Sequence, residues 1–129
     1  MPSAPPDFAR AVAIAAEYSP VALLEPSRGY AHTGSHLFPV QVVPISRIEC
    51  FARGPGVEGL NRERALAVLE ALIRRIPLPP VNVYPCESPG ADGKRFVLYH
   101  GYHRLHLSLA VGYTHIPVAV NHIGAASAA

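Results

Sequence analysis

A strand, a glycine turn, a short helix and a second strand follow one another in the last third of the chain, and this succession limits how it can fold. The apolar residues 95–99 (RFVLY) have the β-branched and aromatic content of a strand. Leu105–Val111 is a short apolar run closed by Gly112, which favours a helix with a glycine just past its end. Residues 116–120 (IPVAV) again predict a strand. Gly101 therefore lies where a strand passes into a helix.

The turn at Gly101 predicts an anion-binding site. A helix N-terminus presents backbone N–H groups and a positive dipole end, which together attract negative charge. His103 and Arg104 follow in the first turn, where cations oppose the dipole, and an anion supplied from outside would remove that conflict. Two interpretations of Gly101 stay open, a helix start that needs a flexible residue and the close approach of a phosphate; its basic neighbours favour the phosphate. Arg104 alone could instead be a structural ion-pair partner of Glu49 or Glu70.

The composition favours one folded domain. The 129 residues are 50% hydrophobic and 16% charged, which is enough for a real core and argues against wholesale disorder. A formal net charge of +2 is too small to support nucleic-acid binding by itself.

The N-terminus lacks a basic start, residues 11–16 are too short for a signal-peptide core, and no stretch has the length of a membrane span. We therefore expect a cytoplasmic protein without a membrane partner. Its two cysteines, Cys50 and Cys86, match no zinc or redox spacing, which favours two thiols over a disulfide.

Periodicity and turn residues predict, in chain order, a helix, a strand, a helix, two strands, a helix and a strand. The predicted elements are residues 7–18, 37–43 with 44–48 continuing the strand, 61–76, 81–84, 95–99, 105–111 and 116–120. Asp7 and Asn61 are the expected N-caps of the first two helices. This order predicts a compact single α+β domain with a small mixed β-sheet and packed helices. We expect residues 1–36 to form an N-terminal helix and irregular extension, 37–123 the domain proper and 124–129 a tail.

The histidines do not predict a metal site. His32 and His36 are four residues apart, which suits a metal only on a helix, and Gly34 between them argues against one. Three more histidines are spaced by three residues, and no carboxylate or cysteine completes them as a ligand set: His100, His103 and His106.

Several short segments between residues 40 and 121 form a combined pattern. They are residues 43–48 (VPISRI), the helix before residues 79–83 (PPVNV), residues 93–98 (GKRFVL), residues 101–104 (GYHR), residues 112–113 (GY) and residues 116–118 (IPV). In this order they resemble the ParB/sulfiredoxin superfamily. The resemblance implies the fold of that superfamily, with nucleotide phosphates bound at the glycine turn.

Carried over residue by residue, the resemblance gives the turn specific roles. Gly101 would allow close backbone approach, while His103 and Arg104 would contact phosphate oxygens. Tyr102 could stack on a base or pack on the first helix. The free-serine kinases of the superfamily also use a glutamate shortly after the first strand, and Glu49 falls near that place.

The sequence departs from the superfamily patterns at several positions, and these departures remove some of the superfamily's functions from what we expect of this chain. Sulfiredoxin has its catalytic cysteine immediately before the His-Arg pair, and because Tyr102 stands there, sulfinic-acid repair is not expected. ParB itself has G-E-R-R, so Tyr102 and His103 replace two of its residues, and the chain ends where ParB would begin its helix-turn-helix. We therefore do not expect a complete chromosome-partition protein. The free-serine kinases carry an acid before the glycine, where this chain has His100.

These observations lead to a nucleotide-binding protein as the expected function. In the first hypothesis it is a phosphotransferase or nucleotide hydrolase that uses ATP or CTP. Gly101, Tyr102, His103 and Arg104 would then hold the nucleotide, with His103 also as general acid or base, Mg²⁺ bridging the phosphates and Glu49 activating the acceptor or water. The alternative is a non-catalytic module that binds a nucleotide or a nucleic-acid backbone and acts through a partner, favoured by the missing acid before the glycine. A ParB-like nuclease that relies on His103 and Glu49 ranks third, and the oligomeric state stays open.

Overall fold

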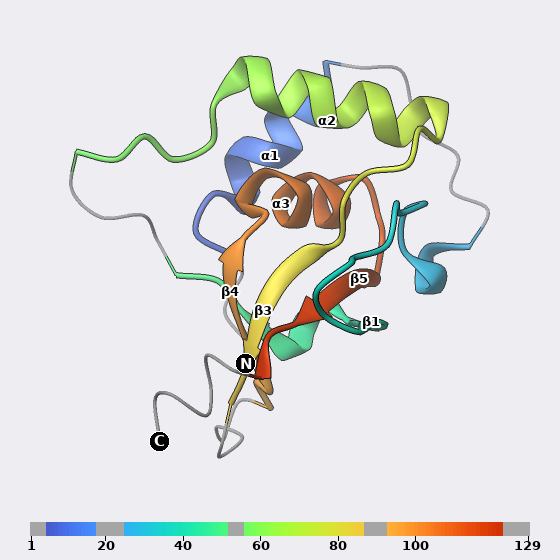
Figure 1. Ribbon diagram of the computed structural model, residues 1–129. Helices are drawn as coiled ribbons and strands as arrows, with labels where there is room; N and C mark the ends of the chain where they lie inside the picture. The colour runs from blue at the N-terminus through green and yellow to red at the C-terminus, as the bar shows by residue number, and fades with distance from the viewer. Residues whose placement is uncertain (1–4, 18–24, 52–55, 87–92, 123–129) are drawn as a thin grey trace.

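The computed structural model describes the chain except for residues 1–4, 18–24, 52–55, 87–92 and 123–129. Its elements are α1 (Phe8–Ala15), η1 (Pro26–Arg28), β1 (Val40–Pro44), η2 (Ile45–Arg47), β2 (Ile48–Glu49), α2 (Arg62–Arg74), β3 (Val81–Pro85), β4 (Phe96–His100), α3 (Tyr102–Ala110) and β5 (His115–Val120). The α-helices gather on one side of the strands, with α3 nearest to them and α2 farthest away (Figure 1). The predicted α+β domain with a mixed sheet is confirmed.

The strands form one sheet in the order β1-β5-β3-β4-β2. β1 pairs antiparallel with β5, β3 runs parallel to β5 and antiparallel to β4, and β2 runs parallel to β4. β1 and β2 thus lie at opposite edges, although only η2 separates them in the chain. Four strand spacings in a flat sheet span about 19 Å, whereas four peptide steps reach at most about 14 Å. The sheet must therefore curl, so that its two edges approach each other.

The predicted strand over residues 37–48 is wrong in its second half. The chain leaves β1 at Pro44, forms the one-turn η2 and buries Ile45 before β2 begins. Ile45 N–H donates to the carbonyl of Thr114 instead of continuing a strand ladder. The first residue of the predicted strand, Leu37, is 82% exposed and lies outside β1. The turn is what transfers the chain from one edge of the curled sheet to the other.

The helices begin where their capping residues predicted, but they end earlier. Asn61 is the N-cap of α2, and its side chain accepts a hydrogen bond from Arg64 N–H at 3.0 Å. The helix was predicted to reach Ile76, but it ends at Arg74 because Arg75 adopts a left-handed conformation with φ 57°. Ile76 is consequently 51% exposed rather than part of the apolar stripe.

One core joins the sheet to all three helices. Ala11 and Ile14 of α1 and the Tyr30 ring belong to it, although they come from the segment assigned to the N-terminal extension. β5 lies at its centre, with residues 116–120 all buried. The boundary of the domain at residue 37 stays a prediction, and the predicted tail, residues 124–129, lies outside the described residues.

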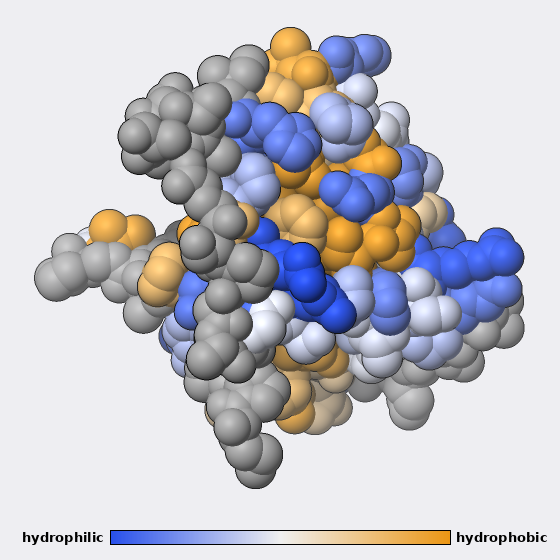
Figure 2. All heavy atoms as spheres, turned by 90° about the horizontal axis from the view of Figure 1, so that it is seen from below, coloured by the Kyte–Doolittle hydropathy of each residue, from blue (hydrophilic) through white to orange (hydrophobic). Residues whose placement is uncertain are grey.

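The surface away from the helices is mixed in character. Seen from below the view of Figure 1, it carries an apolar area bordered by hydrophilic side chains (Figure 2). Within the described part of the chain, no helix has both the length and the apolar character needed to cross a bilayer. Cys50 is buried, Cys86 is half-buried, and the two are not joined by a disulfide.

Candidate functional site

The turn between β4 and α3 depends on glycine for a packing reason. Gly101 has φ 111°, a conformation that residues with a Cβ rarely adopt. A Cβ at this position would lie 2.6 Å from Cγ1 of Val81 on β3 and 2.8 Å from its Cβ. Because Val81 is fully buried, it has no room to withdraw. The close approach of α3 to the sheet therefore requires Gly101.

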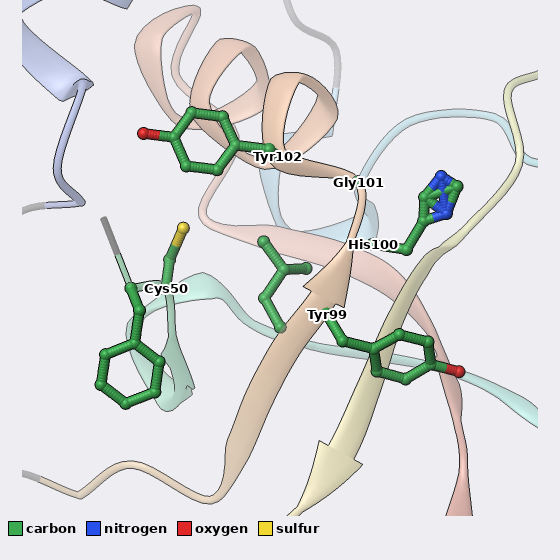
Figure 3. A pocket seen from close by; sticks show the side chains of 7 residues that line it. Cys50, Tyr99, His100, Gly101 and Tyr102 are labelled. Carbon is green, nitrogen blue, oxygen red and sulfur yellow. The ribbon is translucent and has the colours of Figure 1, made fainter. Parts of the chain in front are cut away.

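A pocket of about 220 Å³ opens beside this turn. Its lining consists of Cys50, Phe51, Leu98, Tyr99, His100, Gly101 and Tyr102. β2 covers β4 only as far as Val97, so the last residues of β4 extend past their neighbour and leave this space. Figure 3 shows the Cys50 and Tyr102 side chains on one side of β4 and the Tyr99 and His100 side chains on the other. The pocket thus lies at the N-terminal end of α3, between a thiol and a phenol.

The residues at the end of β4 are held by neighbours on the sheet. The Tyr99 ring stacks on Tyr84 of β3, with centroids 4.1 Å apart and planes at 23°. Its hydroxyl oxygen accepts a hydrogen bond from Asn121 Nδ2 at 3.3 Å. Burial, and then the positive charge of Arg104, lower the pKa of His100 below its ordinary value. The charged form of the His100 imidazole is thus disfavoured at this position.

Tyr102 packs inward rather than standing ready for a base on the surface. It is 8% exposed, and its hydroxyl donates to Oδ2 of Asp7 at 2.6 Å. Asp7 does occupy the N-cap position of α1, but its side chain makes no capping hydrogen bond. Of the two interpretations left open for Tyr102, the geometry agrees with packing on the first helix, while one side of the residue lines the pocket.

His103 is directed into the helical layer. It is 8% exposed, and its Nε2 accepts a hydrogen bond from the backbone N–H of Asn61 at 2.8 Å. This bond places an unprotonated ring nitrogen at the start of α2. His103 is not among the residues that line the pocket.

Arg104 holds the segment that leads into β3. Its Nη1 donates to the carbonyl oxygens of Pro79 at 2.7 Å and Pro80 at 3.0 Å. The hydroxyl of the buried Tyr30 donates to the same Pro79 oxygen at 2.6 Å. Glu70, one of the suggested ion-pair partners, pairs with Arg74 at 2.7 Å. Arg104 thus ties α3 to the Pro-Pro segment through carbonyl groups.

Glu49 lies next to the pocket in sequence but not among its lining residues. It is half-buried in β2, between the buried Ile48 and the buried Cys50. Because successive residues of a strand point to opposite faces, Glu49 faces away from the side that the buried Ile48 occupies.

The predicted site is therefore only partly assembled in one place. Gly101 and Tyr102 line the pocket, whereas His103, Arg104 and Glu49 do not. Their roles toward a ligand stay predictions. The pocket residues that sequence reasoning did not select are Cys50, Phe51, Leu98, Tyr99 and His100. No sequence signal selects them, because Cys50 and Phe51 come beside the end of β4 only through the parallel pairing of β2 with β4, which the structure sets.

The histidines show no metal cluster among the described residues. Within that part of the chain, no three His, Cys, Asp or Glu side chains gather closely enough to hold an ion. His32 Nδ1 accepts a hydrogen bond from Gly34 N–H at 3.1 Å, and this segment is not helical.

Comparison with known proteins gives a structural similarity and no family assignment. No protein-family model and no curated protein matches the sequence. Among solved structures, the chain is similar to a C-terminally truncated chromosome-partitioning protein, ParB from Caulobacter crescentus, complexed with CTP-gamma-S. The TM-score is 0.48 and the sequence identity 20%, over 64% of this chain and 43% of the ParB chain. The chain thus covers less than half the length of that ParB chain.

Proposed function

We propose that this chain binds a nucleotide in the pocket at the N-terminal end of α3. The observation that carries the proposal is the position of the pocket, which is bounded by Gly101 and Tyr102 at the start of that helix. The positive end of a helix dipole and its first N–H groups favour a phosphate there. The resemblance of residues 101–104 to a superfamily that binds nucleotide phosphates at this turn supports the same ligand class.

The walls of the pocket suit the rest of a nucleotide. Phe51, Leu98 and the Tyr102 ring provide apolar and aromatic surface, and Phe51 is 65% exposed. Aromatic side chains of this kind accept a base by stacking. The volume of about 220 Å³ is below the range of about 300–1,000 Å³ common for small-molecule pockets. Part of the nucleotide would therefore lie inside and the remainder across the open rim.

Binding without turnover is the form of this function that the geometry supports best. Among the residues that the structure describes, those that line the pocket include no carboxylate to activate water or an acceptor, and none to hold Mg²⁺. The pocket residues thus do not fit a protein-held Mg²⁺, and we assign no step to the ion. The phosphotransferase, hydrolase and nuclease hypotheses all need Glu49 or His103, which lie outside the lining.

Calorimetric titration with ATP, CTP, GTP and ADP, with and without Mg²⁺, tests the proposal. We expect at least one nucleotide to bind, and Phe51→Ala to weaken it about tenfold by loss of stacking. Leu37→Ala is the matched control, because Leu37 is 82% exposed and does not line the pocket. The Leu37→Ala variant should bind the nucleotide with the same affinity as the wild type. Failure of every nucleotide to bind, or equal losses in both variants, would refute the site.

The same samples distinguish a binding module from an enzyme. We expect no release of phosphate or transfer to an acceptor at saturating nucleotide. If turnover appears and Glu49→Gln abolishes it while binding persists, the catalytic hypothesis replaces the non-catalytic one.

A further inference from the structure

Asp7 stands at the start of α1, but its side chain does not cap that helix. An N-cap aspartate normally accepts a hydrogen bond from the second or third residue of its own helix, and here no such bond forms. Instead, Oδ2 of Asp7 accepts two hydrogen bonds from distant parts of the chain. The Tyr102 hydroxyl donates one at 2.6 Å, and Leu60 N–H donates the other at 3.0 Å. The carboxylate thus joins the start of α1 to α3 and to the loop before α2.

The loop before α2 is shaped to admit this carboxylate. A Cβ at Gly59 would overlap with Oδ2 of Asp7, at the very atom that accepts both hydrogen bonds. Leu60, which follows, is fully buried and donates its N–H to that oxygen. Glycine at residue 59 therefore leaves the space that the Asp7 carboxylate occupies, and any larger residue displaces that side chain.

A second contact connects the same main chain to α3. Asp7 N–H donates to Nε2 of His106 at 3.1 Å, and Nδ1 of His106 lies 2.7 Å from the Tyr102 carbonyl oxygen. Since Nε2 accepts, the neutral imidazole carries its proton on Nδ1 and donates it to that carbonyl. Tyr102 is consequently held at both its side chain and its main chain by residues outside the pocket.

We propose that Asp7 is a positioning residue of the pocket, which fixes the Tyr102 ring as one of its walls and so couples the start of α1 to the binding site. Asp7 itself does not line the pocket and acts through Tyr102. The inference rests on the proposed function only where it concerns the ligand. The placement of the wall can be measured without any nucleotide.

Cys50 supplies the measurement, because its thiol lines the pocket on the same side of β4 as Tyr102 (Figure 3). In a Cys86→Ser background it is the only cysteine of the chain. Its rate of modification by a thiol reagent, in native buffer well below the melting temperature, then reports how often this wall opens.

Three variants remove the contact in different ways. Asp7→Ala deletes the acceptor, Tyr102→Phe deletes the donor while keeping the ring, and Gly59→Ala displaces the carboxylate without altering it. We expect each to accelerate Cys50 modification about fivefold to tenfold, as the loss of one charge-assisted hydrogen bond implies. Asp7→Asn keeps a neutral acceptor and should give an intermediate rate. The double variant Asp7→Ala/Tyr102→Phe should be no faster than the faster single one.

Asn61→Ala is the matched control for general loss of stability. It removes the cap of α2 one residue beyond Leu60 but touches neither Asp7 nor Tyr102 through its side chain. We expect its Cys50 rate to equal that of the parent chain. Acceleration as large as in Asp7→Ala would show that the effect is general opening, and unchanged rates in Asp7→Ala and Tyr102→Phe would equally overturn the proposal.

Added nucleotide separates this inference from the proposed function. Saturating ATP or CTP should slow modification of Cys50 in the parent chain, and Asp7→Ala should weaken that protection about fivefold in nucleotide concentration. If no nucleotide protects Cys50 while Asp7→Ala still accelerates its modification, the proposed ligand is wrong and the positioning role stands. Protection that is identical in both chains would refute a role of Asp7 in binding.

Discussion

The predicted phosphate site depends on Gly101, and there are two explanations of why this residue is a glycine. Substitution of Gly101 by alanine distinguishes them. If glycine is present only to let a phosphate approach, Gly101→Ala should fold normally and lose ligand. The structure indicates a different outcome, because the added Cβ would lie 2.6 Å from Cγ1 of Val81 and 2.8 Å from its Cβ. We therefore expect Gly101→Ala to lower the stability of the fold rather than to fold normally and lose only the ligand.

The magnitude follows from two separate costs. A residue with a Cβ at φ 111° costs about 1–2 kcal/mol relative to glycine. Overpacking against the fully buried Val81 adds about 1–3 kcal/mol, since the strand behind it cannot withdraw. The total of about 2–5 kcal/mol is a large part of the free energy of unfolding of a small domain. At this chain length it corresponds to a fall in melting temperature of about 8–20 °C.

Gly34→Ala is the matched control for the backbone cost alone. Gly34 has φ 85°, and a Cβ there would meet no atom within 4 Å. Its substitution should cost about 1–2 kcal/mol and no more. Denaturant unfolding of both variants and the parent chain at one temperature gives the comparison directly.

Equal losses in Gly101→Ala and Gly34→Ala would refute the packing argument. A Gly101→Ala protein that keeps its stability but no longer binds nucleotide would favour phosphate approach as the reason for the glycine. Val81→Ala provides a further check, because it removes the contact at 2.6 Å but keeps the one at 2.8 Å. Combined with Gly101→Ala, it should destabilise by less than the sum of the two single changes.

Two further predictions concern the helix starts. Asn61→Ala should lower the free energy of unfolding by about 1 kcal/mol in denaturant titration, because α2 loses the cap bond to Arg64 N–H, and an unchanged midpoint would contradict that role. The hydrogen bond from Tyr102 lowers the pKa of Asp7 below its usual value, against the opposing effect of burial. A carboxyl whose pKa is depressed on folding contributes stability above its unfolded pKa and loses it as the pH falls through the folded value. The stability difference between the parent chain and Asp7→Asn should thus be constant from about pH 7 to 5 and shrink below about pH 4; a difference that grows toward acid would contradict it.

The local elements could be predicted because their signals are local. The helix α2 (Arg62–Arg74) carries its cap and its apolar period in adjacent residues, and it begins where expected. The strand over residues 44–48 was mispredicted because apolar content cannot distinguish an extended segment from a turn that buries Ile45. That choice depends on the curl of the sheet, which brings the edges at β1 and β2 within reach of three intervening residues.

In the candidate site, too, some features follow from the local sequence and others from the tertiary structure. The strand, glycine and helix at residues 96–110 were determined by the sequence itself, since a glycine between two apolar periods specifies the turn. Which side chains face the pocket was decided by tertiary structure. Cys50 comes to Tyr102 only through the register of β2 on β4, and His103 and Arg104 turn away because Asn61 N–H and two proline carbonyls require partners. Buried polar groups need a hydrogen-bond partner, and the side chain that the fold brings near them provides it. Local sequence patterns therefore cannot predict which side chain that is.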